Sequence, residues 1–153
     1  MLSTVVMSGS AFAATATTTM PVSMTITAGC QVSAGTLAFG TATGLFSIVN
    51  ATTTLSVTCT NTTPYTIGLD AGGGTGASTT TRKMTGPSAA TISYQLFQNA
   101  GLTTNFGNTI STDTVAGTGS GSAQSISVYG RVPVQTSPAP GSYSDVVNVT
   151  VTY

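Results

Sequence analysis

Apolar and polar residues alternate with a period of two in several stretches of this chain, and no stretch shows the helical period of 3.6. In TLSVTCT (54–60), Leu55, Val57 and Cys59 fall on one side of an extended chain, with Ser and Thr on the other. Such alternation is typical of strands that pack one face against a core. It predicts strands at 54–60, 65–70, 92–97, 124–134 and 147–153.

Turn-forming residues separate these stretches. Runs rich in Gly, Pro, Ser and Asn occupy 61–64, 71–77, 117–122 and 137–141. Several short strands with frequent turns, in a chain of 153 residues, predict a single all-β domain built as an antiparallel β-sandwich.

The composition excludes several functions. Only 4% of the residues are charged, with three basic and three acidic side chains, so we expect no nucleic-acid binding, which needs several cations. The chain has no His and only two Cys, so we expect no metal site of the usual kind and no His-activated nucleophile. The glycine-rich runs precede neither a helical pattern nor a Lys, so we expect no phosphate cradle and no cofactor.

The three aspartates, Asp70, Asp113 and Asp145, are the only acidic side chains that acid–base catalysis could use. Asp70 follows a predicted strand, and Asp145 lies close to the start of another. Asp is common at such turn and strand-end positions because its carboxylate binds nearby main-chain N–H groups. We therefore predict that the protein is not an enzyme.

The first 13 residues, MLSTVVMSGSAFA, end in the small-x-small pattern of a secretory cleavage site. The apolar part is short and no Lys or Arg precedes it, so we interpret 1–13 as a signal peptide truncated at its start. The alternative is an ordinary N-terminal tail. Under the first interpretation, the mature chain begins near Ala14. No segment has the ~18–20 apolar residues of a membrane-spanning helix.

Two cysteines, Cys30 and Cys59, suit an exported protein. An even number of cysteines in an oxidising compartment predicts one disulfide, and closing a loop of this size would stabilise the fold by about 3–4 kcal/mol. The alternative is a pair of buried free thiols.

One further alternating segment lies at the N-terminal end of the mature chain. Its apolar residues are Met20, Val22, Met24 and Ile26. Pro21 cannot donate a hydrogen bond within a sheet, so this strand belongs at an edge. The segment is either the first strand of the sandwich or a strand given to another subunit, whose alternate side chains would fill pockets there.

Several short pieces, in this order, resemble the spore coat protein U family, which includes the subunits of archaic chaperone–usher pili. They are CQVSA (30–34), LAFG (37–40), LSVTCT (55–60), PY (64–65), LD (69–70), RKM (82–84), ISYQLF (92–97), GTGSGSAQSISVYGR (117–131) and GSYSD (141–145) with the strand up to Tyr153. Phe106-Gly107 stands where members often carry Trp-Gly, and Met20 where an aromatic residue is common; both keep an apolar side chain.

The resemblance implies an incomplete immunoglobulin-like sandwich that lacks its last strand. In such a subunit, 14–28 is a donor-strand extension and 29–153 the sandwich domain. Met20, Val22, Met24 and Ile26 would fill the groove of a neighbouring subunit, so in a single chain the extension should project from the body with few contacts before Thr27.

The implied partners are related or identical pilin subunits, a periplasmic chaperone and an outer-membrane usher. The implied product is an extracellular fibre for surface attachment and biofilm. A tip adhesin is disfavoured, because the chain has no room for a receptor domain. The other alternative is a secreted coat or matrix protein with a complete sandwich that does not polymerise.

Overall fold

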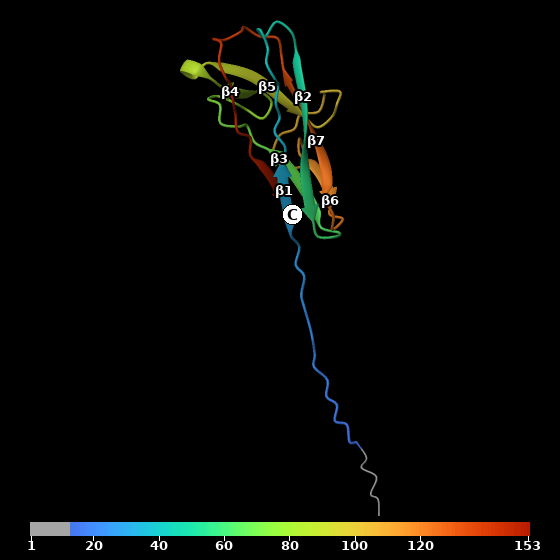
Figure 1. Cartoon of the computed structure of the whole chain (residues 1–153). Helices are drawn as coiled ribbons and strands as arrows, with labels where there is room; N and C mark the ends of the chain where they lie inside the picture. The colour runs from blue at the N-terminus through green and yellow to red at the C-terminus, as the bar shows by residue number, and fades with distance from the viewer. Residues whose placement is uncertain (1–12) are drawn as a thin grey trace, which may run out of the picture.

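A computed structural model describes residues 13–153 (Figure 1). Beyond one short 3-10 turn at Pro87–Ala89, its regular elements are strands. They are β1 (Cys30–Ala34), β2 (Val49–Cys59), β3 (Pro64–Leu69), β4 (Arg82–Thr85), β5 (Thr91–Phe97), β6 (Val115–Thr118), β7 (Gln124–Val132) and β8 (Val149–Thr152).

The strands form two sheets. The larger has the order β1-β2-β7-β5-β4 and the smaller the order β6-β3-β8. Every neighbouring pair is antiparallel. The predicted all-β antiparallel fold is therefore confirmed.

The core lies between the inner faces of the two sheets. Val57 from β2 and Ile67 from β3 are fully buried, and Phe106, from the segment after β5, lies beside them with no exposed surface. Burying apolar area of this kind is the main favourable term in folding. The other buried members are Leu45, Leu55, Cys59, Tyr65, Leu69, Tyr94, Leu96, Val128 and Val132.

All five strands predicted in the body of the chain are present, with shifted ends. The stretch predicted at 54–60 is the second half of β2, and the one at 147–153 shortens to β8. β1, β4 and β6 were not predicted. They have four or five residues each, too few to show a clear alternation, and β4 begins with a charged residue.

The predicted disulfide joins Cys30 to Cys59. These residues are direct partners in the β1–β2 ladder, with their Cα atoms 4.1 Å apart. The described residues contain no free cysteine, so the free-thiol alternative is wrong. The bond fixes the start of β1, where the chain enters the sandwich.

The segment before β1 leaves the body of the molecule. Residues 13–28 form no strand and are exposed, and they run away from the sandwich as a single extended chain (Figure 1). The prediction that this segment projects from the body is confirmed. Of the predicted signal peptide, 1–13, all but Ala13 lies outside the described residues. Within the described range no helix is long and apolar enough to span a membrane.

Candidate functional site

A large apolar groove runs between the two sheets. Its volume is about 1270 Å³. The larger sheet contributes Leu55, Leu96 and Val128 to its walls, and the smaller contributes Leu69 and Val149. Most of these side chains also belong to the hydrophobic core, so the groove is a part of the core that the described residues leave unfilled.

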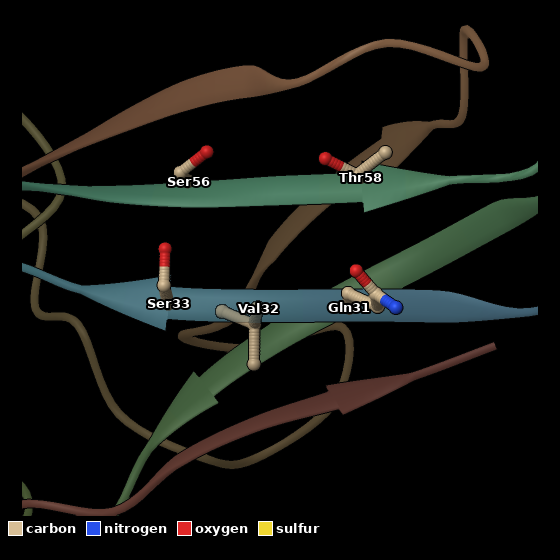
Figure 2. A pocket seen from close by; sticks show the side chains of 5 residues that line it. All are labelled: Gln31, Val32, Ser33, Ser56 and Thr58. Carbon is tan, nitrogen blue, oxygen red and sulfur yellow. The ribbon is translucent and has the colours of Figure 1, made fainter.

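The groove lies beside two unpaired strand edges. Within the part of the chain that the structure describes, β1 pairs only with β2, and β8 pairs only with β3. These edge strands lie near each other and run in opposite directions (Figure 2). Unpaired N–H and C=O groups at such an edge are a template for another strand.

The segment between β1 and β2 forms one wall of the groove. Leu37 and Phe39 pack over Gly130 of β7, where an added Cβ would lie 2.7 Å from Leu37 and 2.8 Å from Phe39. The ring of Phe39 meets Tyr94 edge to face, with centroids 6.0 Å apart. Gly130 thus makes room for the wall.

Polar contacts hold the rim of the groove at Asp145, just before β8. The Tyr94 hydroxyl donates to its Oδ2 at 2.7 Å, and the Gly73 N–H donates to its Oδ1 at 2.7 Å. Gly72 has a positive φ of 75°, and a side chain there would collide with this carboxylate. Burial raises the pKa of the Tyr94 phenol above its ordinary value, and the hydrogen bond to Asp145 raises it further.

A second carboxylate, that of Asp70, holds the segment that leads into β8. Asp70 Oδ1 accepts from the N–H groups of Gly72 and Asn148, both at 2.9 Å, and its Oδ2 accepts from Asn148 Nδ2 at 2.6 Å. Burial alone would raise the pKa of Asp70. The hydrogen bonds from Asn148 and Gly72 outweigh it, so that the pKa lies below its ordinary value of 3.8.

Arg82 joins the two sheets from inside. Its side chain is completely buried, and its guanidinium donates to four main-chain carbonyls. The acceptors are Asp70 O at 2.7 Å, Thr79 O at 2.7 Å, Leu69 O at 2.9 Å and Phe106 O at 2.8 Å. Burial lowers the pKa of this guanidinium. Sequence reasoning missed its role, because main-chain carbonyls carry no sequence signal.

The aspartates make contacts of a structural kind. Asp113 accepts from the Thr109 N–H and from Asn105 Nδ2, and Asp70 and Asp145 hold the loops beside β8, as their predicted turn positions suggested. No group of three or more His, Cys, Asp or Glu comes together within residues 13–153.

A second, shallow depression lies on the outer face of β1 and β2. Its volume is about 140 Å³. The lining residues are Gln31, Val32, Ser33, Ser56 and Thr58 (Figure 2). None of them is charged, and none of their polar side chains is buried, so the depression lacks groups that would fix a ligand.

The four predicted donor residues lie far from any groove wall. Met20 is 82% exposed, Val22 84%, Met24 87% and Ile26 77%. The groove lining includes none of them. Within residues 13–153, no segment fills the apolar groove, and the apolar side chains of the extension pack against nothing.

The comparisons with known proteins agree with this architecture. A solved structure with the same fold is the CsuC–CsuE chaperone–tip adhesion subunit pre-assembly complex, from the archaic chaperone–usher Csu pili of Acinetobacter baumannii. The match has 24% identity and a TM-score of 0.61, and covers 84% of this chain and 40% of the matched chain. No curated protein matches the sequence. The model of the Spore Coat Protein U domain matches residues 16–150, and the chain therefore belongs to that family.

Proposed function

We propose that this protein is a structural subunit of an extracellular pilus of the chaperone–usher type. The extension at 14–28 of one copy enters the groove of the next and completes its sandwich. The observation that supports this most is the complementarity within one chain. Residues 13–153 leave an apolar groove unfilled beside two unpaired strand edges, and the extension carries four exposed apolar residues at alternate positions.

The energies are of the right size for assembly. Burying Met20, Val22, Met24 and Ile26 contributes about 1.5–3 kcal/mol each, or ~6–12 kcal/mol in total. Association costs about 4–15 kcal/mol in lost freedom. Main-chain hydrogen bonds to the free edge of β8 add to the favourable side. Contacts of this head-to-tail kind do not close on themselves, so repetition gives an open filament.

The proposal includes the export route. A periplasmic chaperone would occupy the groove until the chain reaches an outer-membrane usher, where the extension of the next subunit replaces it. Family membership supports this, and the matched solved structure is itself a complex of a chaperone with a pilus subunit. Residues 1–13 would be the secretion signal, the mature chain would begin near Ala14, and the fibre would serve surface attachment and biofilm.

The groove favours this function over a secreted coat or matrix protein that does not polymerise. Such a protein would need a complete sandwich. Here the lining includes Val147 and Val149 next to the free edge of β8, and an exposed apolar edge of this kind promotes aggregation unless a partner strand covers it.

A pair of neighbouring substitutions tests the proposal. Met24→Asp would bury an unpaired charge in the groove of the next subunit and should abolish fibre formation. Ser23→Asp adds the same charge on the opposite face of the strand and should leave most assembly intact. Fibres are sheared from the cell surface and counted by electron microscopy. Normal fibres from Met24→Asp would contradict the proposal.

A further inference from the structure

The main chain is fixed immediately after the extension. The Gly29 N–H donates to Thr60 Oγ1 at 3.2 Å, and the Gly29 carbonyl accepts from the Thr60 N–H at 2.9 Å. Thr60 Oγ1 also lies 2.6 Å from Thr63 Oγ1, and the next residue, Cys30, is bonded to Cys59. Thr27 and Ala28 are the only residues between this fixed point and Ile26. We call 27–29 the hinge.

The groove begins too far from the hinge for the same chain to fill it. Along β1 the groove lining starts at Ala34, five residues after Gly29, which is about 16 Å at ~3.3 Å per residue. The three chain steps from Gly29 back to Ile26 span at most ~10–11 Å. A turn at Thr27 and Ala28 would set Ile26 beside Gly29 and bring only Met20 as far as Gly35.

We propose that the hinge prevents a subunit from filling its own groove and so makes a second copy the acceptor of the extension. This rests on the proposed function, and adds the feature that decides which groove the extension enters. A strand on a flexible linker just long enough to reach its own groove has an effective concentration in the mM range there, which outcompetes other copies at µM concentration. A short hinge removes that advantage, as short hinge loops do in strand exchange between chains.

Lengthening the hinge tests this. A flexible Gly-Ser-Gly-Ser-Gly-Ser segment between Thr27 and Ala28 gives the extension enough chain to return along β1. The variant should stay monomeric, with fibre yield lower by roughly two orders of magnitude. Its melting temperature should exceed that of the parent monomer, and adding Met24→Asp should remove the increase, because Met24 then lies in the groove of its own chain.

Two matched controls isolate the hinge. The same Gly-Ser segment between Ala16 and Thr17 leaves the hinge intact and should assemble like the parent. A stiff Ala-Pro-Ala-Pro-Ala-Pro segment between Thr27 and Ala28 stays extended and should also assemble. Parental fibre yield from the flexible hinge variant, or equal loss of fibres from the flexible and stiff variants, would overturn the hinge proposal. A parent chain that forms no fibres, or that forms them equally well with Met24→Asp, would instead overturn the proposed function.

Discussion

The hydroxyl of Tyr94 on β5 donates a 2.7 Å hydrogen bond to Oδ2 of Asp145, just before β8. Tyr94 belongs to the larger sheet, and Asp145 leads into the edge strand of the smaller one. Both residues also line the groove. This contact therefore sets how the two sheets meet at the rim of the groove.

Tyr94→Phe should test the strength of that contact. The ring keeps its packing against Phe39, while the hydrogen bond to a carboxylate is lost. We expect the free energy of unfolding to fall by about 1.5–3 kcal/mol in a urea titration. Tyr143→Phe is the matched control, because its hydroxyl bonds the Ala139 carbonyl at an exposed position. If both substitutions lowered the free energy of unfolding equally, the Tyr94–Asp145 bond would contribute no more than an exposed hydrogen bond.

Arg82→Met should destabilise the protein strongly. Removing the guanidinium leaves four main-chain carbonyls without this donor, and each buried acceptor left unpaired costs about 1–3 kcal/mol. Arg82→Lys should be intermediate, because an ammonium group lacks the planar fork that reaches several acceptors at once. The measurement is the urea midpoint of each variant. Lys83→Met, at the adjacent position, should change the unfolding free energy by less than ~0.5 kcal/mol; a large loss there would weaken this interpretation.

Acid should lower the free energy of unfolding through Asp70, whose carboxylate holds the loops beside β8. Its folded-state pKa lies below 3.8, so near that pH the unfolded chain binds more protons than the folded one. The contribution of Asp70 to the unfolding free energy is therefore complete above pH 3.8 and is lost as the pH falls through the folded-state pKa. The free energy of unfolding, measured at a series of pH values, should fall less steeply below pH 3.8 for Asp70→Asn than for the parent. Parallel curves would contradict this role.

The disulfide should stabilise the sandwich domain itself. It closes a loop across a sequence separation of 29 residues, so Cys30→Ser with Cys59→Ser should lower the unfolding free energy by about 3–4 kcal/mol. Mass spectrometry without reduction should show the linked peptides in assembled fibres. Free thiols, or a link between subunits, would be the opposing result.

Much of the fold could be predicted from the sequence, because strands with one apolar face show their period directly. In β7, Ile126 and Val128 alternate with serines, and the predicted end at 134 lies two residues beyond the observed one. β6 (VAGT) has one branched apolar residue and no visible period, so only its pairing with β3 makes it a strand.

The candidate site consists of the extension and the groove, and only the extension could be predicted from the sequence. The alternation of Met20 to Ile26 was visible, because it is a local pattern. The groove is not local. It depends on β8 having one neighbour instead of two, and on Gly130 leaving room for Leu37 and Phe39. Arg82 was also hidden, since a buried cation that binds only carbonyls looks the same in a sequence as an exposed one.

A cryo-electron-microscopy map of the assembled fibre tests the central claim most directly. The groove of each subunit should contain residues 20–26 of a neighbouring copy, with Met20, Val22, Met24 and Ile26 directed between the sheets and the strand paired to the free edge of β8. A map in which residues 20–26 pair only within their own sandwich, or in which the groove holds another segment, would contradict the account.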